Sequence, residues 1–181
     1  MLPRRIAPPR PRRVEIRRAA SRRDHAHARS VLNQQRAWIE CLLGADVTTV
    51  QPAAAAEYAH PSVYYALPHG QVVVALLDHL PVGVVAVKAL SRERAELKRL
   101  YVVPSARGYG IGARLVEEAI AVAAELGFLS LYLETSSAWM HSARALYVAY
   151  GFRETDAGDF RHIDHAIGME LELAVPVRRA A

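Results

Sequence analysis

Apolar and polar positions recur along most of the chain with the periods of strands and helices. Apolar and charged residues alternate over residues 14–17, which predicts a first strand. A polar turn leads into residues 25–43, where apolar side chains follow helical spacing. The same reasoning predicts strands at 72–77, 82–89, 95–103, 129–133, 152–155 and 166–173, and helices at 53–59, 110–126 and 138–150.

The order of these elements indicates the fold class. The strands at 72–77 and 82–89 are separated by four residues with turn character, which predicts a hairpin. Glycine follows each of the two later helices, at the position that commonly ends a helix. Hairpin-connected strands combined with crossover helices predict a single-domain α/β fold with one mixed central β-sheet flanked by helices.

Composition agrees with a single folded domain. The chain has 181 residues, of which 52% are hydrophobic and 23% are charged, as in ordinary globular proteins. Cys41 is the single cysteine, so a disulfide within the chain is excluded. No run of 18 apolar residues and no secretory signal is found, which favours a cytoplasmic protein without a membrane partner.

The formal net charge of +5 comes from one end of the chain. Residues 1–13 hold five arginines, four prolines and no acid, and the remainder has 23 − 5 = 18 basic residues against 18 acidic ones. Nucleic acid is therefore not the expected partner of the domain. We expect a basic, Pro/Arg-rich disordered tail at 1–13, a domain at 14–175 and a short C-terminal tail at 176–181.

A glycine-rich segment joins a predicted strand to a predicted helix. It consists of Arg107, Gly108, Tyr109, Gly110, Ile111 and Gly112, followed by Ala113. Its glycines let the backbone approach a ligand closely. The helix start beyond them offers unpaired N–H groups and a partial positive charge, which together suit a pyrophosphate. Arg107 adds a fixed cation.

A dinucleotide site is an alternative for the same segment. Gly108, Gly110 and Ala113 satisfy the dinucleotide fingerprint formally, and Glu134 ends the next strand. Against this alternative, four residues separate the strand from the first glycine, about 95 residues of other elements precede the motif, and only 47 residues follow Glu134. The NAD(P)-binding enzyme stays open at this point.

The segment and its surroundings resemble the GNAT superfamily of N-acetyltransferases. Arg107-x-x-Gly110-x-Gly112 is similar to the acetyl-CoA pyrophosphate loop of that family. The resemblance extends over about residues 14–173, and its further motifs are the strand at 95–104, Leu133-Glu-Thr135, the Leu146-Tyr147 pair and the Gly151-Phe152 pair.

The resemblance implies a fold in which the strand before the loop and the strand after it splay apart. The slot between them would hold the pantetheine arm of acetyl-CoA as cosubstrate. The residues that the resemblance assigns to cofactor binding are Leu100, Val102, Val103, Arg107, Gly108, Tyr109, Gly110, Ile111, Gly112 and Ala113. An unpaired strand edge in the slot offers donors for the thioester oxygen.

The resemblance also implies two catalytic residues. Glu96 corresponds to a position where several members place a glutamate base, and alternation puts it on one face with Lys98 and Leu100. A surface ion pair is the alternative for Glu96. Tyr147 matches the family's tyrosine acid, and its alternative is packing on the core. Met140 stands where many members carry an asparagine, with His141 beside it.

The expected reaction is transfer of an acetyl group from acetyl-CoA to a primary amine by direct attack in a ternary complex. The acceptor is a small molecule or a peptide, and residues 44–70 are expected to cover its site. A non-catalytic acetyl-CoA-binding regulatory domain stays open as an alternative. A homodimer is a further expectation. We expect no metal. His25 and His27 are two residues apart on a predicted helix and point to different faces, and His162 and His165 lie in a polar loop without an obvious third ligand.

Overall fold

The computed structural model describes residues 12–156, 158 and 165–174. The expected tails at 1–13 and 176–181 lie outside the described residues, except for Arg12 and Arg13, and His162 lies outside them as well. The domain limits at 14 and 175 therefore stay predictions.

The described strands form one seven-stranded sheet with the order β1-β2-β3-β4-β5-β7-β6. All neighbouring strands are antiparallel except β4 and β5, which are parallel. The mixed sheet agrees with the sequence-based expectation. The strands are β1 (Val14–Arg18), β2 (Gly70–Leu77), β3 (Leu80–Ala89), β4 (Arg94–Val102), β5 (Ser130–Ser136), β6 (Arg153–Thr155) and β7 (Ala166–Glu172).

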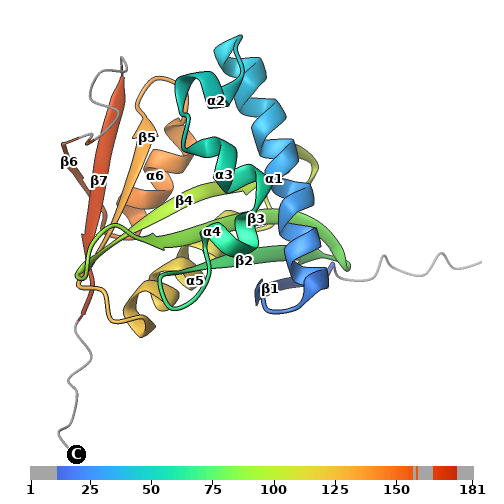
Figure 1. The fold of residues 1–181 in the computed structure, drawn as a ribbon, viewed down its shortest axis with the longest axis horizontal. Helices are drawn as coiled ribbons and strands as arrows, with labels where there is room; N and C mark the ends of the chain where they lie inside the picture. Colours follow the sequence, from blue (N-terminus) through green and yellow to red (C-terminus); the bar gives the residue numbers. More distant parts are fainter. Residues whose placement is uncertain (1–11, 157, 159–164, 175–181) are drawn as a thin grey trace, which may run out of the picture.

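Helices cover both faces of this sheet. Figure 1 shows α1 and the short helices α2 to α4 in front of the sheet, with α5 behind it. Helix α6 packs near β5. The helices are α1 (Arg22–Leu43), α2 (Val47–Val50), α3 (Ala54–Ala59), α4 (Pro61–Tyr64), the 3₁₀ turn η1 (Pro104–Ala106), α5 (Ile111–Glu125) and α6 (His141–Ala149).

Helix α1 begins three residues earlier than the apolar pattern predicts. Ser21 caps it by accepting a hydrogen bond from the backbone N–H of Asp24, and the Asp24 carboxylate accepts from the backbone N–H of Ser21. This reciprocal capping box satisfies two N–H groups that would otherwise lack partners. Polar capping, rather than apolar spacing, therefore sets where α1 starts.

The two central strands part after a short pairing. β4 and β5 pair at Arg94 with Ser130, at Ala95 with Leu131 and at Glu96 with Tyr132. Beyond Glu96, β4 continues along β3 to its end, while β5 continues along β7. The predicted splay of the central strands is thus present, and it leaves a gap between the carboxyl-terminal parts of β4 and β5.

A bulge interrupts β4 within this gap. Arg99 has φ 59°, and the register changes so that Lys98 pairs with Ala86 while Tyr101 pairs with Val84. One residue of β3, Val85, therefore faces two residues of β4, Arg99 and Leu100, which adds one residue to β4. Tyr101, rather than Leu100, shares the face of Glu96 and Lys98. The alternation expected from the sequence fails for Leu100 because it assumes an uninterrupted ladder.

A glycine in β3 sets how closely α5 approaches the sheet. A Cβ added to Gly83 would lie 3.0 Å from Leu115 Cδ1 and 3.1 Å from Ile111 Cγ2. Glycine therefore permits the first turns of α5 to lie directly on β3, which fixes the helix start next to the end of β4. Among the described residues, no helix has both the length and the apolar character needed to span a membrane.

Candidate active site

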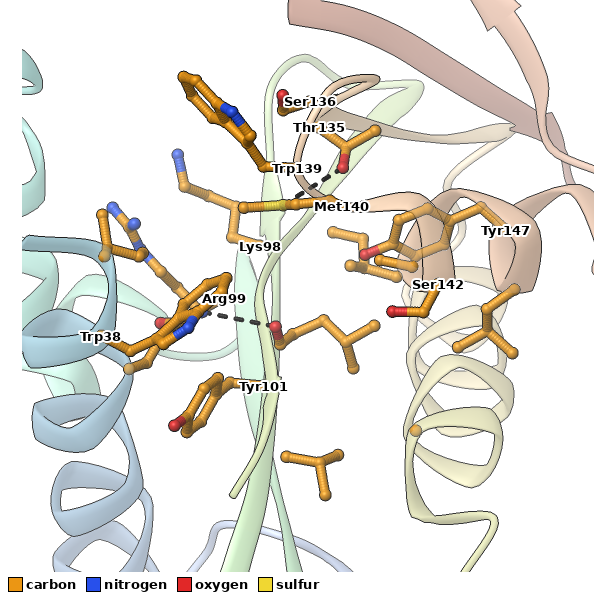
Figure 2. Close-up of a pocket in the computed structure, with 18 of the residues that line it drawn as sticks. Trp38, Lys98, Arg99, Tyr101, Thr135, Ser136, Trp139, Met140, Ser142 and Tyr147 are labelled. Carbon is orange, nitrogen blue, oxygen red and sulfur yellow. Dashed lines mark hydrogen bonds between the residues drawn. The ribbon is translucent and has the colours of Figure 1, made fainter. Parts of the chain in front are cut away.

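A cleft of about 710 Å³ opens where β4 and β5 part. Figure 2 shows Trp38, Arg99 and Tyr101 on the α1 side of β4, and Ser142 and Tyr147 on the α6 side. The cleft is lined by α1, β4, the loop before α5, the end of β5 and α6. It therefore reaches both faces of the sheet.

The glycine-rich loop lines the cleft. Gly108 and Gly110 adopt φ values of 84° and 72°, which side chains other than glycine rarely tolerate. Gly110 is the N-cap of α5, so the N–H groups of the first helical residues lack acceptors within the helix. These N–H groups and the positive end of the helix dipole are suited to hold an anion at the cleft.

Arg107 connects this loop to the end of β4. Its Nε donates a hydrogen bond to the carbonyl oxygen of Val102, 3.1 Å away. The carbonyl of Leu100 accepts from Gln35 Nε2 at 3.5 Å. The Val102 carbonyl faces away from β3, and in a strand the N–H of the same residue points to the same edge. Val102 thus presents backbone groups to the cleft.

Ten of the twelve predicted site residues line the cleft. They are Glu96, Leu100, Val102, Arg107, Gly108, Gly110, Ile111, Gly112, Ala113 and Tyr147. The other two, Val103 and Tyr109, are described but lie outside its lining. Val103 is buried and donates its N–H to Val82 on β3. Tyr109 is 44% exposed, and its ring lies 5.3 Å from the guanidinium of Arg12.

Glu96 is a buried carboxylate in the cleft. Only 9% of the residue is exposed, and its Oε2 lies 3.3 Å from Lys98 Nζ. Burial raises the pKa of Glu96, and the charge of Lys98 offsets part of this effect. A carboxylate with a raised pKa is suited to accept a proton near neutral pH.

A second buried carboxylate forms ion pairs with two side chains of β4. Glu57 of α3 is 1% exposed and lies 2.7 Å from Arg99 Nε and 3.2 Å from Lys98 Nζ. Tyr65 donates a hydrogen bond of 2.5 Å to it. The sequence places Glu57 in the predicted helix at 53–59, within the segment expected to cover the acceptor site, but does not predict this role. The adjacent charges of Lys98 and Arg99, which break strand alternation, were the available signal.

Tyr147 lies across the cleft from β4. Its residue is 5% exposed, and its ring packs against Phe152 with centroids 5.6 Å apart. Figure 2 shows its hydroxyl pointing from α6 toward β4. Burial raises the pKa of Tyr147, which keeps the hydroxyl protonated and able to donate. Both the packing and the functional interpretations of this residue are compatible with its position.

The nicotinamide alternative does not fit this fold. A dinucleotide site requires a doubly wound parallel sheet, whereas this sheet has a single parallel pair among its described strands. Glu134 accepts a hydrogen bond from the Tyr132 hydroxyl at 2.9 Å. No group of three or more His, Cys, Asp or Glu side chains placed to hold a metal occurs within the described part of the chain.

A mixed sheet with two parted central strands, and a glycine loop that caps a helix beside the gap, defines the acetyltransferase class of the GNAT type. The profile of the acetyltransferase (GNAT) family matches residues 35–152, and the chain belongs to this family. The resemblance noted from the sequence is confirmed.

Two curated relatives support the same assignment. An uncharacterized N-acetyltransferase from Schizosaccharomyces pombe is 36% identical over 120 residues, which cover 65% of this chain and 73% of the relative. The uncharacterized N-acetyltransferase YjgM from Escherichia coli is 35% identical over 96 residues. That match covers 53% of this chain and 52% of YjgM, so the chain spans about half the length of this relative.

Solved structures share the fold. The PaiA N-acetyltransferase from Thermoplasma acidophilum, in complex with coenzyme A, superposes with a TM-score of 0.68 at 20% identity and covers 88% of this chain and 99% of its own. A GNAT family acetyltransferase from Elizabethkingia anophelis with acetyl-CoA bound has a TM-score of 0.53 at 22% identity, covering 64% and 82%. The expectation of acetyl-CoA as cosubstrate agrees with these complexes.

Proposed function

We propose that this chain is an N-acetyltransferase, which moves the acetyl group of acetyl-CoA to a primary amine by direct attack in a ternary complex. The observation that carries the proposal is the cleft itself. It brings an anion-binding helix start, a strand edge without a neighbouring strand, a buried carboxylate and a buried tyrosine hydroxyl into one space. The acceptor is a small molecule or a peptide.

The donor would lie along the loop and the edge of β4. The N–H groups from Gly108 to Ala113 would hold its pyrophosphate, assisted by the positive end of the α5 dipole. The backbone N–H groups of Leu100 and Val102, on the edge of β4 that has no neighbouring strand, would bond the pantetheine arm and the thioester oxygen. Arg107 fixes the loop to that edge, because its Nε already bonds the Val102 carbonyl.

The proposed reaction begins with a proton transfer. An ammonium group cannot attack, so Glu96, directly or through a water molecule, accepts its proton. The amine nitrogen then forms a bond to the thioester carbon, and the carbon–sulfur bond breaks. Tyr147 protonates the departing thiolate, and a hydroxyl held protonated by burial is suited to this step. The acetylated nitrogen then gives up its second proton, which restores the Tyr147 hydroxyl, and Glu96 releases its proton to water. The products are an acetamide and free CoA.

Thermal unfolding with ligands tests donor binding. Acetyl-CoA and CoA, each at about 100 times its dissociation constant, should add roughly 2.7 kcal/mol of stability, and NADH should add none. Arg107→Ala combined with Gly110→Ala should abolish the shift with both CoA species. A shift with NADH alone would contradict the proposal.

Thiol release from acetyl-CoA in the presence of amines tests catalysis. Release that depends on an amine and is lost in Glu96→Gln supports the enzyme. Acetyl-CoA binding without release for any amine would instead favour a regulatory domain. The homodimer, the cytoplasmic location and the basic tail stay predictions.

A further inference from the structure

Four exposed apolar side chains border the cleft from elements other than the glycine loop. Leu42 and Leu43 at the end of α1 are 41% and 37% exposed, Val50 of α2 is 38% exposed, and Trp139 before α6 is 52% exposed. All four line the cleft. Exposed apolar residues that border a cavity together mark a ligand-binding surface more often than scattered ones do.

The acceptor is expected on the α1 side of β4. The α1 side of β4 carries Trp38 and Tyr101, whose ring centroids lie 5.9 Å apart, whereas the glycine loop leads into α5 on the other face of the sheet. The donor would therefore enter from the α5 side. The acceptor would approach Glu96 from the side walled by Trp38, Leu42, Val50 and Trp139.

The charged side chains of β4 in this part of the cleft already form ion pairs. Lys98 lies between Glu96 and Glu57, and Arg99 pairs with Glu57, so two cations face two carboxylates. Among the described lining residues the acids are Glu96 and Glu134, and Glu134 accepts the Tyr132 hydroxyl. One ammonium of an acceptor would meet Glu96. A second ammonium further out would meet apolar side chains, which disfavours it.

We propose that the acceptor is a primary amine on an apolar aliphatic or aromatic body with a single positive charge. This inference rests on the proposed function and narrows its substrate class. The amine would lie at Glu96, and the apolar body would cover the exposed surface of Leu42, Val50 and Trp139. Polyamines and other acceptors with a second cation are expected to be poor substrates, because the second ammonium would meet apolar side chains.

A matched pair of amines tests the substrate class. Hexylamine and 1,6-diaminohexane have the same chain length and differ in one terminal ammonium. The value of kcat/KM for hexylamine should exceed that for the diamine by about tenfold or more, because an unpaired charge would be placed in apolar surroundings. Phenethylamine should also be accepted. Equal or faster reaction of the diamine would overturn the inference while leaving the acetyltransferase intact.

Variants of the apolar wall test its location. Trp139→Ala and Leu42→Ala should each raise KM for hexylamine, with roughly a tenfold change for the tryptophan, and leave KM for acetyl-CoA unchanged. Val63→Ala is the control, because Val63 is 74% exposed and lies outside the cleft lining. An unchanged KM for hexylamine in Trp139→Ala would place the acceptor elsewhere. Absence of thiol release with every amine would overturn the proposed function and this inference together.

Discussion

The ammonium of Lys98 lies 3.3 Å from a carboxylate oxygen of Glu96 inside the cleft. Lys98 is also within 3.2 Å of Glu57, so one cation is shared by two buried acids. Burial raises the pKa of Glu96 and the positive charge of Lys98 lowers it, and burial has the larger effect. The proton affinity of the proposed base therefore depends on the neighbouring lysine.

The pH profile of Lys98→Met should reveal this dependence. A base acts in its ionised form, so activity rises with pH as Glu96 loses its proton. Removal of the lysine charge removes an effect that lowers the pKa of Glu96, so the acid limb of kcat/KM should move to higher pH. Lys88→Met is the control, since Lys88 contacts the Tyr64 ring and lies outside the cleft lining. An acid limb that stays in place, or moves to lower pH, would exclude Glu96 as the base.

Glu57→Gln should destabilise the fold by about 3–5 kcal/mol, because it removes one partner of a buried ion pair. Glu57 and the side chain of Arg99 are 1% and 8% exposed. Glu40→Gln is the control, because its partner Arg36 and Glu40 itself are partly exposed and such pairs contribute about 0–1 kcal/mol. Chemical denaturation at neutral pH measures both variants.

The destabilisation in Glu57→Gln should depend on pH. Burial alone would raise the pKa of Glu57, but Arg99 and Lys98 outweigh it and the folded-state pKa is lowered. A lowered folded pKa contributes stability that is present above the unfolded-state pKa and is lost as pH falls through the folded value. The difference between wild type and variant should therefore shrink at acidic pH. A constant difference down to acid pH would show that the charge of Glu57 is not responsible.

Alanine variants of two glycines at opposite ends of α5 should distinguish an effect on stability from an effect on donor binding. Gly110 and Gly127 have φ values of 72° and 87°, and an added Cβ would meet nothing within 4 Å at either position. Alanine at each should cost about 1–2 kcal/mol from backbone strain alone. Calorimetric titration with CoA should show weaker binding for Gly110→Ala and unchanged binding for Gly127→Ala, because only Gly110 lines the cleft. Equal CoA affinity in the two variants would argue against the loop as the pyrophosphate site.

Tyr147→Phe should lower kcat by about 10²-fold or more if its hydroxyl protonates the thiolate. The substitution keeps the ring that packs on Phe152, so stability and acetyl-CoA affinity should change little. Tyr150→Phe is the matched control, because its hydroxyl bonds Glu117 and the residue lies outside the cleft lining. Steady-state thiol release compares the two. Similar kcat values would assign Tyr147 to packing.

Much of the fold could be predicted from local patterns. The hairpin of β2 and β3 and helix α5 followed directly from apolar periodicity and turn residues. The start of α1 did not, because the polar pair Ser21 and Asp24 sets it. The orientation of Leu100 was wrong because the bulge at Arg99 shifts the strand by one residue. Such a bulge is stabilised by tertiary contacts to Glu57, which a linear pattern does not contain.

The early parting of β4 and β5 divides the sheet into two smaller sheets. One holds β1 to β4 and the other holds β5, β7 and β6, and the three residue pairs between Arg94–Glu96 and Ser130–Tyr132 are the ladder that joins them. Helix α5 packs against strands of both halves, so substitution of Leu115, which faces β3 and lies outside the cleft lining, would alter the width of the opening without touching its lining.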